Sequence, residues 1–117
     1  GAKLAKPDNP VVVLVGDGGF MFTMPEIITA AELQLSLPII IWENGGLKQI
    51  QDDMDNSNIR RVGVEGINPD FEALAKACHC EAIYADSEKA LIQAISEGLK
   101  VDCPTLIIIK ENDTWLR

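Results

Sequence analysis

The sequence predicts an α/β fold, an open parallel sheet with helices on both faces. Apolar, β-branched runs alternate with helical patterns along the chain, an order that is typical of parallel sheets. Most of these runs are continuously apolar, as expected for strands that helices cover on both sides. With 117 residues, 47% of them hydrophobic, the chain is long enough for one domain with one packed core. We therefore expect residues 1–117 to form a single three-layer module.

Four segments are expected to form the strands of this sheet. They are residues 11–15, 38–42, 82–84 and 105–109. Three of them are uninterrupted apolar runs, which favours strands with both faces buried.

Three segments between or after these strands have the pattern of helices. Residues 25–35 are apolar almost all round, which predicts a buried helix, with residues 23–26 as its capping box. Residues 69–78 place apolar side chains on one face, and Asn68 is the expected N-cap. Residues 87–99 have an apolar inner face and a charged outer one.

The stretch 45–68 does not fit this alternation. It is polar and lacks a clean period, so we expect a loop with one short helix over 48–54. A long irregular connection after the carboxyl end of a strand is often functional, and ligands of open α/β sheets bind at that edge. The acidic run 52–55 lacks the glycine and the final Glu of a calcium-binding loop, so we interpret it as a solvated charge run.

Composition argues against several functions. Eighteen acidic against ten basic residues give a net charge of -8, so no basic surface for nucleic acid is expected. No apolar run approaches the roughly 20 residues that span a bilayer, and residues 1–7 do not resemble a signal peptide. An odd number of cysteines, three, favours a reducing, cytoplasmic location. Because the sequence does not begin with Met, we expect a cut or processed piece.

The triplet Cys78-His79-Cys80 has the residue types of a metal site but the wrong spacing. Neighbouring side chains on a strand point to opposite faces, and structural zinc sites usually place two or more residues between paired cysteines. We expect two buried thiols at a helix-to-strand junction, with His79 at the surface. Cys103 is likewise interpreted as a packing residue.

The ends of the first two predicted strands carry the residues that indicate a ligand. Residues 16–19, Gly-Asp-Gly-Gly, follow the first strand directly, and their amides suit an anionic group such as phosphate. Asp17 would repel that phosphate unless a cation, most simply Mg²⁺, lies between them. The second strand ends in Glu43-Asn44-Gly45-Gly46. If the two strands are neighbours, Asn44 lies beside Asp17 as a second oxygen ligand, and Gly46 can turn a carbonyl inward.

Together these motifs resemble the cofactor motif of thiamin diphosphate (ThDP)-dependent enzymes. That motif is Gly-Asp-Gly followed some two dozen residues later by Asn-Asn, here residues 16–18 and then Glu43-Asn44. The flanking residues resemble the family too, so the resemblance covers essentially the whole chain. It implies a truncated ThDP-binding fold, the C-terminal, diphosphate-binding module of the acetolactate synthase and 2-oxo acid decarboxylase superfamily. Residues 44–52 resemble decarboxylases of basic or bulky 2-oxo acids, such as 5-guanidino-2-oxopentanoate.

The resemblance implies a cofactor site built from both loops. The cofactor-binding residues it implies are Asp17, Gly18, Gly19, Asn44, Gly46 and Leu47. Three of them would ligate Mg²⁺: Asp17 and Asn44 through side-chain oxygens and Gly46 through its main-chain carbonyl. The amides of Gly18 and Gly19 would hold the diphosphate. Glu43 replaces the first Asn of the family's pair, whereas the ligating second Asn is retained.

The resemblance assigns no catalytic residue to this chain. In the family, the Glu that activates the cofactor's pyrimidine lies on the N-terminal module of a partner subunit. The hydrophobic residue that bends the cofactor lies further upstream than this sequence reaches. We therefore expect a fragment that is inactive alone, binds cofactor weakly and self-associates, with a homodimer as the default. The full enzyme would act on a 2-oxo acid.

Three alternatives stay open. The chain could be an acetolactate synthase-type carboligase module instead of a decarboxylase module. It could be a non-catalytic, flavodoxin-like binding or signalling domain in which Asp17 is an isolated acidic residue. It could also be a structural fragment whose cofactor site is half-built.

Overall fold

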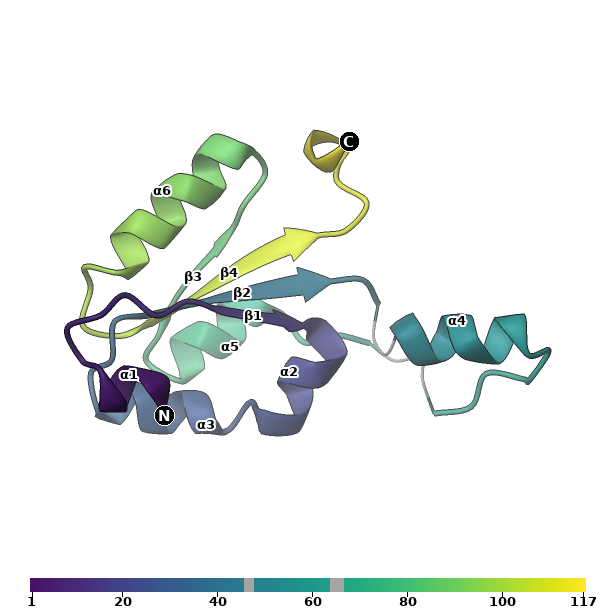
Figure 1. Ribbon diagram of the computed structural model, residues 1–117, viewed down its shortest axis with the longest axis horizontal. Helices are drawn as coiled ribbons and strands as arrows, with labels where there is room; N and C mark the ends of the chain where they lie inside the picture. Colours follow the sequence, from purple (N-terminus) through teal and green to yellow (C-terminus); the bar gives the residue numbers. More distant parts are fainter. Residues whose placement is uncertain (46–47, 64–66) are drawn as a thin grey trace.

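The computed structural model describes residues 1–45, 48–63 and 67–117 (Figure 1). The elements, in chain order, are α1 (Ala2–Ala5), β1 (Val13–Gly16), α2 (Asp17–Thr23), α3 (Glu26–Glu32), β2 (Leu37–Glu43), α4 (Lys48–Asn56), α5 (Phe71–Ala77), β3 (Glu81–Tyr84), α6 (Glu88–Gly98), β4 (Pro104–Lys110) and the 3-10 helix η1 (Thr114–Leu116). The predicted strands agree with the observed ones to within two residues at each end.

The described strands form one parallel sheet in the order β1-β2-β4-β3. Val15 of β1 lies opposite Ile41 of β2, and Ile41 lies opposite Ile108 of β4. The first two strands are therefore neighbours, and their carboxyl ends meet at the same edge of the sheet. The predicted fold class, an open parallel sheet in an α/β fold, is confirmed.

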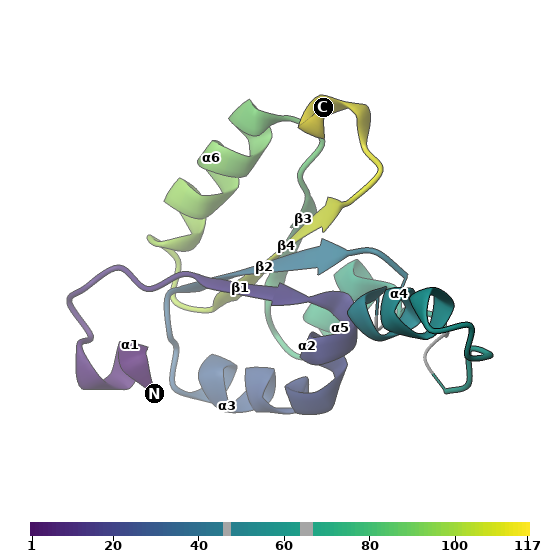
Figure 2. The same cartoon turned by 45° about the vertical axis from the view of Figure 1, so that its right-hand side comes forward.

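Helices cover both faces of the sheet, as predicted. Figures 1 and 2 show α2, α3 and α5 on one face and α6 on the other. The first face holds the larger core, made of Phe20, Ile27, Ile39, Ile41, Phe71, Ala75, Cys78, Cys80, Leu106 and Ile108. The second face buries Ala85, Ala94, Ile107 and Ile109. The ring centroids of Phe20 in α2 and Phe71 in α5 are 5.9 Å apart in an edge-to-face arrangement, which joins these two helices.

The strand β1 forms one edge of the sheet and is incompletely covered. Leu14 is 73% exposed and Val12, just before the strand, is 43% exposed. Leu14 lies on the face that α6 covers, but α6 packs over β2 and β4. An apolar strip beside β1 therefore faces solvent in this chain.

The helix predicted over 25–35 is shorter and less buried than expected. It ends at Glu32, and Ile27 is the buried side chain in it, whereas Ile28 is 45% exposed. One side of α3 packs on the sheet and nothing in the described chain covers the other side. The capping box is also wrong, since Pro25 occupies the N-cap position and no side chain caps the helix.

The N-cap predicted for α5 is wrong as well. The cap is Asp70, whose Oδ1 accepts hydrogen bonds from the N–H groups of Glu72 at 3.1 Å and Ala73 at 3.2 Å. Asn68 and Asp70 are both favoured N-cap residue types, and the choice between them depends on tertiary contacts. The side chain of Asn68 is engaged elsewhere, as described below.

The segment predicted to be an irregular connection projects from the body of the molecule. Its helix α4 extends two residues beyond the expected end. Figure 1 shows α4 well to one side of the sheet, which accounts for the long dimension of 48 Å against 30 and 26 Å.

The cysteines near α5 lie where they were predicted. Cys78 and Cys80 are buried between α5 and β3, and His79 between them is exposed. Cys80 Sγ lies 3.4 Å from the main-chain oxygen of Cys78. Among the described residues, no helix has the length and apolar character that crossing a membrane would require.

Candidate functional site

A fully buried carboxylate lies at the carboxyl edge of the sheet. Asp17 is the first residue of α2, directly after β1, and its exposed fraction is 0%. Its Oδ2 accepts hydrogen bonds from the main-chain N–H groups of Asn44 and Gly45, both at 3.0 Å, and from Nδ2 of Asn68 at 2.7 Å. Its Oδ1 accepts from the N–H of Gly18 at 2.8 Å. These bonds compensate for the removal of the carboxylate from water.

Three segments that are distant in the sequence meet at this carboxylate. The pairing of Gly16 with Trp42 brings the loop after β1 next to the loop after β2. The third segment carries Asn68 and leads into α5. The condition on which the predicted metal site depends, that Asp17 and Asn44 are close, is met in the structure.

The described contacts of Asp17 suit a cation. All the donors described at Asp17 are neutral N–H groups, so they stabilise its negative charge without neutralising it. A carboxylate is an oxygen ligand of the kind that a hard divalent ion such as Mg²⁺ prefers, and an asparagine, Asn44, follows the neighbouring strand.

Open space beside Gly16 suits a ligand that approaches the backbone closely. Gly16 has an ordinary φ of −73°, and a Cβ built on it would meet nothing within 4 Å. Neither backbone conformation nor packing against the described residues therefore requires glycine at this position. A Cβ on Gly19 would lie at a normal contact distance, 3.6 Å, from Val15. In contrast, Gly45 has a φ of +90°, a conformation that favours glycine.

The structure brings together part of the predicted site. Asp17, Gly18 and Asn44 lie in contact, and Gly19 is in the first turn of α2. The predictions for Gly46 and Leu47 lie outside the described residues. Asn68 was missed because its contact with Asp17 crosses 51 positions of the chain. The only sequence signal for it was its place at the end of the irregular connection.

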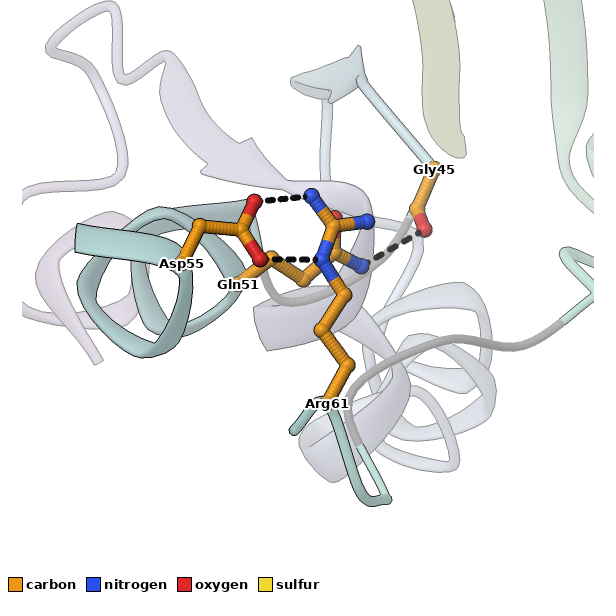
Figure 3. Close-up of polar contacts among 4 residues, drawn as sticks. All are labelled: Gly45, Gln51, Asp55 and Arg61. Atoms are coloured by element: carbon orange, nitrogen blue, oxygen red, sulfur yellow. Dashed lines mark hydrogen bonds and ion pairs between the residues drawn. The ribbon is translucent and has the colours of Figure 1, made fainter. Parts of the chain in front are cut away.

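Figure 3 shows one polar contact between the projecting segment and the loop after β2, and one ion pair within the segment. Gln51 of α4 is only 5% exposed, and its Nε2 lies 3.5 Å from the carbonyl oxygen of Gly45. Arg61 binds both carboxylate oxygens of Asp55, through Nε at 2.9 Å and a terminal nitrogen at 2.5 Å. Asp55 of the acidic run is paired with Arg61, yet its side chain is 47% exposed, so it remains in contact with solvent.

Glu43, which stands where the family has Asn, continues β2 in this structure. It lies opposite Lys110 of β4 in the register, and its carbonyl accepts a hydrogen bond from the N–H of Glu111 at 3.0 Å. The Lys110 ammonium lies 5.1 Å from the ring centre of Tyr84. Burial, and then the negative charge of Glu43, raises the pKa of Tyr84 above its usual value. The Glu43 main chain therefore takes part in the sheet, next to a strand that carries a basic residue.

The fold and this edge define a class of protein, the parallel α/β modules with a polar site in the loops after adjacent strands. Comparison with known proteins gives the family. The chain matches the family "Thiamine pyrophosphate enzyme, C-terminal TPP binding domain" over residues 1–109, and it belongs to that family. The resemblance seen in the sequence is thereby confirmed.

Relatives and solved structures agree with this assignment. The chain is 49% identical over 111 residues to "Probable 2-ketoarginine decarboxylase AruI" of Pseudomonas aeruginosa, covering 94% of this chain and 20% of the relative. It is 34% identical to "Probable acetolactate synthase large subunit" of Methanococcus aeolicus, covering 92% and 18%. The structure of a thiamine diphosphate-dependent 4-hydroxybenzoylformate decarboxylase from Rhodococcus jostii RHA1 superposes with a TM-score of 0.85 and 28% identity, covering 95% and 21%. The chain thus spans about a fifth of the length of the proteins it matches.

Proposed function

We propose that this chain is the diphosphate- and Mg²⁺-binding module of a ThDP-dependent 2-oxo acid decarboxylase, and that residues 1–117 form that single module. The observation that carries the proposal is the fully buried Asp17 carboxylate, held by N–H groups from the loop after the neighbouring strand. A buried negative charge at the ligand-binding edge of a parallel sheet is explained when a cation and an anionic cofactor complete the site.

Each residue of the proposed site has a defined task. Asp17 and Asn44 supply side-chain oxygens to Mg²⁺, and Gly46 supplies its main-chain carbonyl. The amides of Gly18 and Gly19 bind the diphosphate, and Leu47 belongs to the same cofactor-binding set. The open space beside Gly16 supports close approach of the cofactor to the backbone.

The chemistry of decarboxylation would come from the cofactor, which accepts the electrons released when carbon dioxide leaves a 2-oxo acid. This chain contributes binding and orientation, and we assign it no catalytic side chain. We propose that activity needs the N-terminal, pyrimidine-binding module of a partner subunit in a cytoplasmic homo-oligomer, a dimer by default. The 117 residues alone are expected to be inactive.

A 2-oxo acid with a basic side chain is the substrate class that we favour. The support is the 49% identity to a protein named as a 2-ketoarginine decarboxylase. The second candidate is a carboligase of the acetolactate synthase type, supported by the 34% identity to a protein named as an acetolactate synthase. The family match argues against a flavodoxin-like signalling domain.

Calorimetry with ThDP tests the cofactor site. We expect weak binding in the presence of Mg²⁺ and none when EDTA replaces it. Asp17→Asn should abolish the binding, because the variant lacks the charge that attracts the cation. Asp8→Asn makes the same charge change at an exposed position before β1 and should bind as the wild type does. Binding that is independent of Mg²⁺, or equal loss in both variants, would contradict the proposed site.

A further inference from the structure

We propose that Asn68 is a positioning residue for the metal-binding carboxylate of Asp17. This inference rests on the proposed function, in which Asp17 ligates Mg²⁺. Neither the cofactor motif nor any resemblance drawn from the sequence gives Asn68 a role at the site. Its role follows from a contact that only the folded chain reveals.

The contact is a short hydrogen bond to a fully buried partner. Nδ2 of Asn68 lies 2.7 Å from Oδ2 of Asp17, whereas the two main-chain donors to the same oxygen lie at 3.0 Å. It is the shortest of the described hydrogen bonds to this carboxylate. Hydrogen bonds to an ionised acceptor are shorter and stronger than those between neutral groups.

Asn68 comes from a different segment of the chain than the other donors to Oδ2 of Asp17. The other donors to Oδ2, Asn44 and Gly45, are adjacent residues of one loop. Asn68 comes from the segment before α5, at the far end of the connection that contains α4. With donors from both ends of this connection, Oδ2 is fixed on two sides and rotation of the carboxylate is restricted.

The residues that follow Asn68 are anchored to the rest of the fold. Pro69 follows it and restricts its backbone, and Asp70 caps α5. Phe71, the first residue of α5, has an exposed fraction of 0% and packs edge-to-face on Phe20 of α2. Because α2 begins at Asp17, donor and acceptor lie on elements that are already packed together.

The hydrogen bond from Asn68 affects metal binding because it orients the carboxylate that would ligate the metal. With three of the described donors at Oδ2 and one at Oδ1, the carboxylate is held in one orientation, and a metal ion bound at it meets an oriented ligand. Loss of a residue that orients a metal ligand typically weakens metal affinity by about 10- to 100-fold. We expect an effect of this size when the Asn68 donor is removed.

The test is the Mg²⁺ concentration that gives half-maximal ThDP binding in the 117-residue chain. Asn68→Ala should raise it by about 10-fold or more. Asn9→Ala, an exposed position before β1, should leave it unchanged. Melting temperatures without ligand are measured in parallel, because a purely structural role would lower them and leave the Mg²⁺ requirement as it is. That outcome would overturn the inference and leave the proposed function intact.

Two further readouts keep the test decisive. Asn68→Leu has nearly the same side-chain shape without the donor, so it replaces the alanine variant if that variant does not fold. In the wild type, the assigned NMR signal of the Asn68 side-chain amide should shift when Mg²⁺ and ThDP are added together. An unshifted signal in a chain that binds both would overturn the inference. A wild-type chain that binds neither would overturn the inference and the proposed function together.

Discussion

The contact between Phe20 and Phe71 gives the sharpest test of how the site is built. The two rings, 5.9 Å apart, join α2, which begins with Asp17, to α5, which follows Asn68. Phe71→Leu keeps an apolar side chain but removes the aromatic pair. We expect a loss of about 0.5–1.5 kcal/mol for the pair and roughly 1 kcal/mol for the smaller buried surface.

The assay is thermal unfolding followed by circular dichroism. In a domain of this size, 1 kcal/mol corresponds to a change in Tm of about 4 °C, so Phe71→Leu should lower Tm by about 6–10 °C. Phe22→Leu is the matched control, since Phe22 also lies in α2 but is 77% exposed. It should change stability by less than about 0.5 kcal/mol.

A double-mutant cycle isolates the ring contact itself. Phe20→Leu, Phe71→Leu and the double variant should give a coupling energy of about 0.5–1.5 kcal/mol. The reasoning is refuted if the coupling energy is indistinguishable from zero. It is also refuted if Phe22→Leu lowers Tm as much as Phe71→Leu does.

Three other predictions concern the start of α5 and the cysteines. Asp70→Ala removes the acceptor of the two N-terminal N–H groups of α5 and should destabilise the chain by about 1 kcal/mol; an unchanged Tm would show that Asp70 is not the effective cap. Burial, followed by the charges of Cys78 and Cys103, raises the pKa of Cys80 from 9.0 to about 11. Because the pKa of Cys80 is higher in the folded chain, its thiol adds to the free energy of unfolding, and this contribution is complete below pH 9. The contribution is lost as the pH rises through about 11, and unfolding measured as a function of pH tests this. An alkylating reagent at pH 8 should label the half-exposed Cys103 before Cys80, and mass spectrometry showing the reverse order would contradict the burial argument.

The strands could be predicted from the sequence because their signal is local. Runs such as residues 105–109 are apolar at every position, and β4 is indeed buried along almost its whole length. The predicted closeness of Asp17 and Asn44 followed from parallel strand order alone, provided that β1 and β2 were neighbours. Their placement at one edge needed no knowledge of side-chain contacts.

The predictions from the sequence were wrong where tertiary contacts decide which of several locally favourable conformations forms. Asn68 and Asp70 have similar intrinsic preferences for an N-cap, and the hydrogen bond from Asn68 to Asp17 is a contact that no local pattern encodes. The glycine-rich residues 16–19 were expected to form a loop, but Asp17–Thr23 form α2, in which Phe20 is buried against α5. The almost wholly apolar residues 25–35 predicted a buried helix, yet Ile28 is 45% exposed among the described residues.

The open edge at β1 has a practical consequence for anyone who uses this module by itself. Among the described strands, β1 is paired with β2 on one side only, so its outer edge offers main-chain N–H and C=O groups to an extended peptide, and we expect concentrated samples to associate edge to edge. Placing a lysine at position 14 would discourage such pairing while leaving Asp17 and its hydrogen bonds untouched. Solubility engineering of a stand-alone cofactor-binding scaffold should therefore begin at this strand.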